Sequence, residues 1–337
     1  MKCHCCASER VKKAGRFSNK NRVVQRFQCL RCGKTFSEIQ PLSETRIDSE
    51  KGVQVVHLLC EGMGINAIVR LTGVSKPAVL NALRSAGLHC AALLDAKCRN
   101  LKPSHVELDE AWTFVQRKQH LAEDHPVFGN QYCWQSIDQP TKFIINWQVS
   151  KRSKRTALQF LGDLRSRVTS HVFDLTTDGF KPYRDFDGAV FRNFGYAVNY
   201  GVEVKHYGSL SDQKNERRYS PLICTSCKRF VYTGCRDTRE ITVNHAERQN
   251  LNIRLFNRRF TRLTLGYSKK LANLEHSVAL MVAFHNFCRP HSALYQKATE
   301  TTPAKQITPA MAIGLTDHVW TVQELLSENL TPQQQTA

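Results

Sequence analysis

The sequence lacks any long apolar run. No stretch approaches the roughly 20 apolar residues of a membrane-spanning helix, and the N-terminal residues MKCHCCASERVKK contain no apolar segment long enough for a secretory signal. The chain also has no GxxxxGK[ST] loop and no HExxH sequence. These absences argue against a membrane protein, a secreted protein, a P-loop ATPase and a zinc protease, and they favour a cytoplasmic location.

Acidic residues are scarce beside basic ones. Lys and Arg number 48 against 29 Asp and Glu, which gives a formal net charge of +19 and a pI near 9.5. Such a balance points to a polyanionic partner, and nucleic acid is the commonest one. With 41% hydrophobic residues the chain has enough apolar material for a core, and 337 residues predict two or three domains.

Two CxxC pairs stand out among the thirteen cysteines, which would stay reduced in a chain that is not secreted. The four residues are Cys3, Cys6, Cys29 and Cys32, with a basic loop between the pairs. Four thiolates on two tight turns can close a tetrahedron around Zn²⁺, so the spacing predicts a zinc ribbon at residues 1–42. His4 and Cys5 remain alternatives to a neighbouring ligand. Unliganded buried cysteines fit this short polar segment poorly.

Residues 48–90 show helical periodicity interrupted by glycines. Ser75 is a good N-cap, and Pro77 falls in the first turn of the helix that follows. The pattern predicts a helix-turn-helix domain with residues 75–86 as its recognition helix. Three side chains of that helix would face a DNA major groove, namely Lys76, Asn81 and Arg84. A plain helical hairpin is the alternative.

From residue 104 onward the sequence alternates as strands do. Three strand-like runs (HVELDEAWTFVQ, QYCWQSIDQ and KFIINWQVS) precede a helical segment and a fourth strand that ends at Asp178. This is the order of a ribonuclease H-like core, which we predict over residues 104–295. Asp109 in the first strand and Asp178 would lie on neighbouring strands. Taken singly, Asp109 is also compatible with a solvent-facing position, and Asp178 with an Asx turn.

A third acid, Glu247, begins a strongly basic stretch. Asn244 and Glu247 form a capping-box-like pattern, so Glu247 is predicted in the first turn of a long helix. At about 100° per residue, Arg254 and Arg258 return to within about 20° of the direction of Glu247. A carboxylate followed by arginines suits an acid that holds a divalent metal beside DNA phosphates held by the arginines. A helix-start glutamate on a solvated basic face is the alternative.

At these residues the chain resembles the transposases of the insertion sequence one (IS-one) family. The resemblance rests on ELDEAWTFV, TTDGFKPY and NHAERQNLNIRLFNRRFTRLT, with NFCRPHSAL and TPAMAIGLTDHVW following in the family's order, and it covers nearly the whole chain. It implies a DDE transposase in which Asp109, Asp178 and Glu247 are catalytic acids that hold Mg²⁺ or Mn²⁺. Arg254 matches the basic residue that DDE enzymes often place two helical turns after the glutamate.

The DNA-binding surface expected from this resemblance extends past Arg254. Its further arginines are Arg258, Arg259 and Arg262. The partner would be double-stranded DNA, both the ends of the element and the target. The protein would act as a homodimer or higher oligomer on DNA, in a prokaryotic cytoplasm and associated with the nucleoid.

The spacing between Asp178 and Glu247 exceeds that of the shortest family members, which predicts an insertion at about residues 206–240. It carries Cys224, Cys227 and Cys235. A second metal site would need a fourth ligand such as His206 or His245, so a basic flap over the DNA is the favoured interpretation. Residues 296–337 are predicted as a C-terminal tail.

Three other functions compete with transposition. A DNA-binding regulator with a vestigial catalytic core is disfavoured by acids at all three positions. A ribonuclease H-like nuclease without joining activity would have the same acids but little need for two N-terminal DNA-reading modules. A structural nucleoid protein would not need this order of strands.

Overall fold

The computed structural model divides the chain into two compact units. One comprises Met1–Cys98, Thr113–Asn130 and Asn252–Ala337, and the other comprises Arg99–Trp112 and Gln131–Leu251. The residues described are 3, 5–6, 8–19, 22–37, 42, 45, 47–122, 125–208, 223–234, 237–299 and 303–328. The predicted domain limits near residues 90, 104 and 295 do not coincide with the limits of these units, because helices from both ends of the chain share the first unit.

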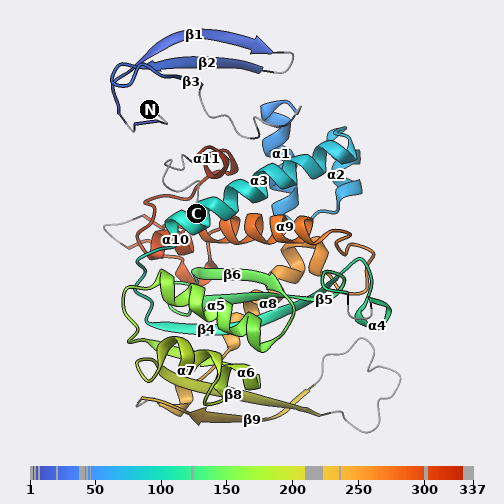
Figure 1. Cartoon of the computed structure of the whole chain (residues 1–337), viewed down its shortest axis with the longest axis vertical. Helices are drawn as coiled ribbons and strands as arrows, with labels where there is room; N and C mark the ends of the chain where they lie inside the picture. The colour runs from blue at the N-terminus through green and yellow to red at the C-terminus, as the bar shows by residue number, and fades with distance from the viewer. Residues whose placement is uncertain are drawn as a thin grey trace. The chain divides into compact units, whose positions relative to one another are not determined.

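A small antiparallel sheet follows the first cysteine pair (Figure 1). Its strands, in the spatial order β1-β2-β3, are β1 Val11–Asn19, β2 Arg22–Cys29 and β3 Thr35–Ser37. Gly33 lies in the turn between β2 and β3 with a left-handed φ of 72°, and its N–H donates to the Cys29 carbonyl at 3.0 Å. The second CxxC pair therefore lies on a tight turn between two strands, as the predicted ribbon requires.

Three helices follow the ribbon, as the sequence predicts. They are α1 Ser49–Cys60, α2 Ile65–Thr72 and α3 Lys76–Lys97. The Asp48 side chain caps α1 by accepting the backbone N–H groups of Glu50 and Lys51. Gly73 ends α2 in the left-handed conformation, at a φ of 68°, which a residue without a Cβ adopts at little cost.

The third helix is longer than predicted, because it continues past residue 86 to Lys97. Its second half buries apolar residues at three- and four-residue steps, including Cys90, Leu93 and Leu94. This face packs against α9, Leu271–Ala283 (Figure 1). The two helices approach so closely that a Cβ at Gly87 would fall 2.4 Å from the Cβ of His276. The extension of α3 is thus a packing element.

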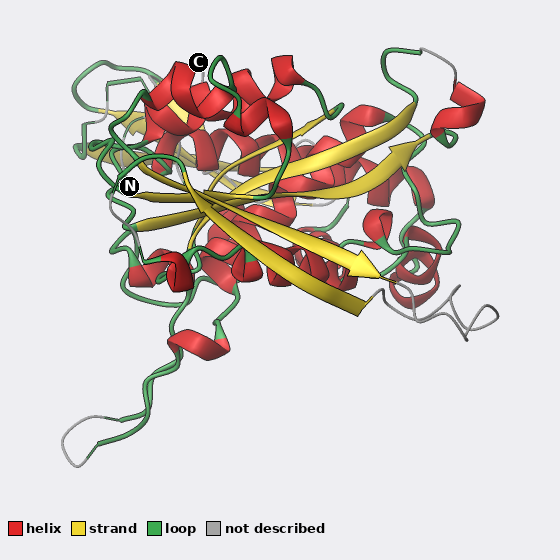
Figure 2. Cartoon of the chain, turned by 90° about the horizontal axis from the view of Figure 1, so that it is seen from below, coloured by secondary structure: helices red, strands yellow, loops and turns green. Residues whose placement is uncertain are grey.

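The second unit is built on a six-stranded mixed sheet, which confirms the predicted α/β class at this level (Figure 2). In spatial order the strands are β6 Ile144–Ser150, β5 Gly129–Asp138, β4 His105–Val115, β7 Asp174–Thr177, β8 Asn199–Gly208 and β9 Ile223–Val231. β4 pairs in parallel with β7, and β7 with β8. β5 and β6 form an antiparallel pair, as do β8 and β9.

The remaining helices are mostly short. The α-helices are α4 Gln119–Ala122, α5 Lys154–Arg167, α6 Lys181–Arg184, α7 Ala189–Phe194, α8 Asn244–Phe256, α10 Pro309–Ala312 and α11 Val322–Ser327. Three 3₁₀ turns span Thr238–Glu240, Arg258–Phe260 and Ser292–Leu294, and a π-helical turn, Phe284–Cys288, follows α9. In the second unit α5 packs on β6 and α7, and Phe160 of α5 meets the buried Trp134 of β5 with ring centres 5.9 Å apart.

Two predicted segments fall partly outside the described residues. Of the predicted insertion, the end of β8 (residues 206–208), β9 and its flanks (223–234) and residues 237–240 are described, whereas residues 209–222 and 235–236 are not. In the predicted tail, residues 300–302 and 329–337 lie outside the described part.

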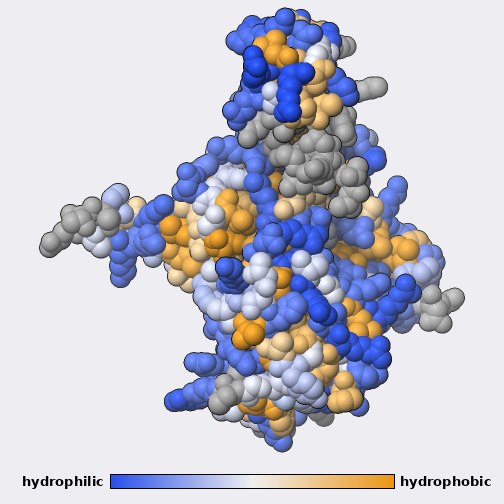
Figure 3. Space-filling model, turned by 60° about the vertical axis from the view of Figure 1, so that its left-hand side comes forward, coloured by the Kyte–Doolittle hydropathy of each residue, from blue (hydrophilic) through white to orange (hydrophobic). Residues whose placement is uncertain are grey.

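Hydrophilic side chains predominate on the face drawn in Figure 3, with separate apolar patches between them. Within the described ranges, no helix combines the length and the apolar composition needed to cross a membrane.

Candidate functional site

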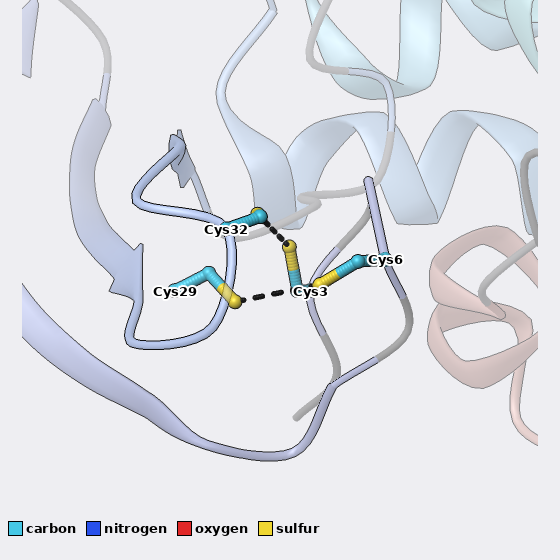
Figure 4. Close-up of side chains that lie close together, drawn as sticks. All are labelled: Cys3, Cys6, Cys29 and Cys32. Atoms are coloured by element: carbon cyan, nitrogen blue, oxygen red, sulfur yellow. Dashed lines mark hydrogen bonds between the residues drawn. The ribbon is translucent and has the colours of Figure 1, made fainter.

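The four predicted zinc ligands come together in the ribbon (Figure 4). The sulfur atoms of Cys3, Cys6, Cys29 and Cys32 all lie within 4.8 Å of one another. Two of the pairs, Cys3 with Cys32 and Cys6 with Cys29, are 3.6 Å apart. A tetrahedral zinc with Zn–S bonds of about 2.3 Å separates its sulfurs by about 3.8 Å, so this cluster can hold the ion.

Backbone N–H groups soften the negative charge of the cluster. Arg31 donates its N–H to the Cys29 sulfur at 3.3 Å, and Cys5 donates its N–H to the Cys3 sulfur at 3.4 Å. Hydrogen bonds from the backbone of Cys32 and Arg31 lower the pKa of Cys29 to about 6, whereas burial and the neighbouring cysteine side chains raise the pKa of Cys6 and Cys32. Without a metal, thiolate character therefore falls mainly on Cys29. The Cys5 side chain is exposed and stands outside the cluster, and His4 lies outside the described residues.

We expect the full-length protein, purified without chelator, to carry about one zinc ion per chain. Cys32→Ser should lose most of it, because a structural zinc site uses four ligands. Cys5→Ser is the matched control and should keep it. Metal analysis of the three proteins provides the test. Less than half an equivalent in the wild type, or equal zinc in the two variants, would contradict the assignment.

The three predicted catalytic acids line one open cavity of about 780 Å³ in the second unit. Asp109 lies on β4, Asp178 directly follows β7, and Glu247 lies in the first turn of α8. β4 and β7 are parallel, and Glu107 pairs with Thr176. Two residues further along the chain in each case, Asp109 therefore lies beside Asp178. The order of strands thus brings together acids that are far apart in the sequence.

Two buried carboxylates hold the start of α8 against the sheet. Glu107 of β4 accepts the backbone N–H groups of His245 at 2.8 Å and Ala246 at 3.0 Å, and it bonds the His245 ring at 2.8 Å. Glu203 of β8 accepts the backbone N–H of Val243 at 3.1 Å. These acceptors replace the usual N-terminal cap and fix the position from which Glu247 projects.

The predicted capping role of Asn244 is therefore wrong. Asn244 is the first residue of α8, and its side-chain oxygen instead accepts a hydrogen bond from Lys205 at 2.9 Å. The physical reason is that sheet carboxylates already satisfy the first N–H groups of the helix.

The acids that approach most closely include one that the sequence did not single out, Glu110. Asp109, Glu110 and Asp178 each place an oxygen within 4.8 Å of the other two, a spacing that can hold a divalent cation. Burial, and then the charges of Glu110 and Asp178, raise the pKa of Asp109 well above its usual value. Burial, followed by the charge of Asp178, raises the pKa of Glu110 to about 7. Each raised pKa reflects, first, the cost of burying a carboxylate charge and, second, the charge of its acidic neighbours, and a bound cation would offset both.

Neighbouring side chains orient this acid group. The Asn250 amide, in the second turn of α8, donates to Asp109 Oδ2 at 2.7 Å. The fully buried Tyr183 donates its hydroxyl to Glu110 Oε1. Arg152 donates from Nε to Glu110 at 2.9 Å and from Nη2 to Asp178 at 2.8 Å.

Glu247 lines the same cavity but is not in the close group of acids. Its Oε2 lies 2.6 Å from Nζ of Lys205, a residue of β8 that also lines the cavity. Glu247 is therefore paired with Lys205 in this structure. The third member of the close group, with Asp109 and Asp178, is Glu110.

The predicted DNA-binding residues differ in exposure. Lys76, Asn81 and Arg84 are exposed on α3, and Arg258 and Arg262 are exposed beyond α8. Arg254 is half-buried in the last turn of α8 and is not among the residues that line the cavity.

Arg259 departs from the prediction. Its Nε donates to the hydroxyl of the buried Ser268 at 3.0 Å, and burial lowers its pKa to about 10. Arg259 thus lies in the 3₁₀ turn Arg258–Phe260 with its side chain partly buried, whereas its neighbour Arg258 is exposed.

The cysteines of the predicted insertion do not form a metal group within the described part of the chain. Cys224 and Cys227 are exposed on β9, and Cys227 donates its S–H to Glu203 at 3.2 Å. Of the two residues considered as a fourth ligand, His245 bonds Glu107. Cys235 lies outside the described residues.

Comparison with models of protein families finds none that matches the chain, and comparison with curated proteins finds no similar sequence. The function is therefore inferred from the chemistry of the chain's own residues.

Proposed function

We propose that the chain is a DDE-type DNA transposase similar to those of the IS-one family. It would bind the ends of an insertion sequence and catalyse metal-dependent strand cleavage and strand transfer. One observation carries the proposal: three acids from separate segments, Asp109, Asp178 and Glu247, line one cleft in a chain with a net charge of +19. A cluster of acids inside a basic protein suits a metal that works on a polyanion.

The order of strands supports this proposal. The sequence β6-β5-β4-β7-β8, with β4, β7 and β8 parallel, is the arrangement expected of a ribonuclease H-like core. In such a core the first strand and the strand beside it present their acids at one edge of the sheet. Asp109 on β4 and Asp178 after β7 occupy those two places.

The donor set fits magnesium better than zinc, because it consists of carboxylate oxygens and holds no thiolate. Magnesium, when bound, would neutralise the scissile phosphate, activate the attacking hydroxyl and stabilise the leaving oxygen. Asp109 and Asp178 would hold it, with Glu110 or Glu247 as the third acid. Asn250 keeps the carboxylate of Asp109 turned toward the cleft.

The N-terminal part would supply DNA recognition. Lys76, Asn81 and Arg84 are exposed on the first three turns of α3, which suits the recognition helix of a helix-turn-helix. Zinc in the four-cysteine cluster would have a structural role, because four protein ligands leave no open coordination position.

The experiment that tests this function uses DNA carrying the inverted repeats expected to flank the coding gene. With Mg²⁺ the wild-type protein should produce free 3′-OH ends at the repeats and then joined products. Cleavage without joining would favour the nuclease alternative. Binding to the repeats with neither product would favour a DNA-binding regulator.

A further inference from the structure

Arg152, which lines the cavity, bridges two carboxylates, one that lines the cavity with it and one buried behind it. It donates to Glu110 at 2.9 Å and to Asp178 at 2.8 Å, and its guanidinium carbon lies 4.0 Å from the centre of the Phe180 ring. The two acids differ in exposure: the Glu110 side chain is 2% exposed, and that of Asp178 is 33% exposed. Glu110 also accepts the Tyr183 hydroxyl, so it is fixed from two sides.

Lys205 repeats this arrangement on β8. Its Nζ lies 2.6 Å from Glu247 and 3.4 Å from Glu203. The Glu203 side chain is 1% exposed, and that of Glu247 is 38% exposed. Glu203 is fixed by further partners, since Arg229 lies 3.2 Å away and the backbone N–H of Val243 donates to it at 3.1 Å.

Each cation thus has one buried anchor carboxylate, Glu110 or Glu203, and one partly exposed exchangeable carboxylate, Asp178 or Glu247. The exchangeable carboxylates are two of the three acids expected to hold a divalent ion. An ion in the cleft must therefore compete with Arg152 and Lys205 for the same oxygens.

We propose that Arg152 and Lys205 couple divalent-ion binding to DNA binding. An ion that takes up the exchangeable carboxylates frees one side of each cation, while the anchor carboxylates keep both cations at the cleft. The freed N–H donors then bind phosphate oxygens of the DNA, which are the strong acceptors that Arg and Lys prefer. The inference rests on the proposed function, since it takes the cleft acids as holders of the ion.

The coupling must act in both directions. An ion that strengthens DNA binding by some factor is itself bound more tightly by that factor when DNA is present. Without DNA the cations compete with the ion, and with DNA they are occupied by phosphate. Arg152 and Lys205 are thus positioning residues that make the two ligands cooperative.

The test measures binding of a short mixed-sequence DNA duplex with and without Ca²⁺, an oxygen-preferring ion. Ionic strength is held constant, and chelator is omitted so that the cysteine cluster keeps its zinc. For the wild type we expect Ca²⁺ to tighten DNA binding on the order of tenfold, within the usual range of coupling between sites. Lys205→Gln should lose a clear part of this gain, because only Arg152 then remains to be released, and Lys205→Arg should keep the gain in full.

Lys228→Gln is the matched control. Lys228 is exposed on β9, pairs with Val204 in the sheet and does not line the cavity. Its loss should change DNA affinity equally with and without Ca²⁺. Lys205→Gln should fold, because Glu203 retains Arg229 and the Val243 N–H as partners.

Two further measurements test whether Lys205 competes with the ion for Glu247. Without DNA, Lys205→Gln should bind Ca²⁺ more tightly than the wild type, because a competing cation is gone. Without Ca²⁺, Glu247→Gln should bind DNA more tightly than the wild type, because Lys205 is already released. An undiminished Ca²⁺ gain in Lys205→Gln, or weaker Ca²⁺ binding by that variant without DNA, would overturn the proposal.

Failure of the inference is distinguishable from failure of the proposed function. The binding measurements use Ca²⁺ or no divalent ion, and none of them requires cleavage. Ca²⁺ coupling without cleavage or joining in Mg²⁺ would refute the transposase, whereas cleavage without coupling would refute only the role of the two cations.

Discussion

Glu247→Gln should reduce the rate of magnesium-dependent strand cleavage by a factor of about 10² or more, the usual effect of removing a group that stabilises charge in a transition state. The amide keeps the size of the side chain but loses the charge that would hold the ion. DNA binding should persist or become slightly tighter, because one negative charge near the phosphates is removed. Cleavage rates are compared at saturating DNA, so that affinity does not enter the comparison.

Two variants make this result interpretable. Glu110→Gln alters the acid that stands closest to Asp109 and Asp178, while Glu240→Gln alters an exposed acid outside the cleft. We expect Glu240→Gln to cleave at the wild-type rate and Glu110→Gln to be less impaired than Glu247→Gln. Should Glu247→Gln cleave within a few-fold of the wild type while Glu110→Gln is inactive, Glu110 is the third acid and Glu247 serves mainly to pair with Lys205.

Glu107→Ala should destabilise the protein by about 3 kcal/mol, because it leaves buried N–H donors at the start of α8 without an acceptor. Glu107 is fully buried and accepts the N–H groups of His245 and Ala246. The loss should also weaken divalent-ion binding, since the start of α8 positions Glu247. Urea unfolding measures the loss of stability, provided that the dependence of the unfolding free energy on urea concentration is unchanged. Titration with Ca²⁺ measures the loss of divalent-ion affinity.

Glu107→Gln is the conservative comparison, because its amide oxygen can still accept from the backbone. It should lose less stability than Glu107→Ala. Equal stability of Glu107→Ala and the wild type would show that the cap does not hold the helix. A stability loss with unchanged ion affinity would show that the cap does not position Glu247.

Three acids that line the cavity could be predicted, because each stands at a place that the sequence pattern marks. Asp109 lies in an alternating strand, Asp178 ends a buried strand, and Glu247 opens a helix. Parallel pairing of the two strands then brings the two aspartates level without any further information.

Glu110 was missed for a physical reason. Successive side chains of a strand point to opposite faces, so nothing in the strand pattern marks Glu110 as a partner of Asp109 in one site. In the structure both carboxylates reach Asp178. Tyr183 and Arg152 hold Glu110 there, and these partners are distant in the sequence.

The positions of Arg152 and Lys205 between pairs of acids could not be predicted from the sequence. Arg152 and Lys205 are two among 48 basic residues, and only the folded sheet shows that each lies between two acids. The same holds for the length of α3, whose second half is determined by its contact with α9, and for Arg259, which Ser268 holds inside. Tertiary contacts decided each of these features.

The most direct measurement is strand cleavage of DNA carrying the flanking inverted repeats, with Mg²⁺, by the wild type and by Asp109→Asn. Asp109 belongs to the predicted acid triad and also to the close acid group of the structure. We expect free 3′-OH ends and joined products from the wild type, and neither from Asp109→Asn although that variant still binds the DNA. Cleavage by Asp109→Asn at a rate near that of the wild type, or no magnesium-dependent products from either protein, would contradict this expectation.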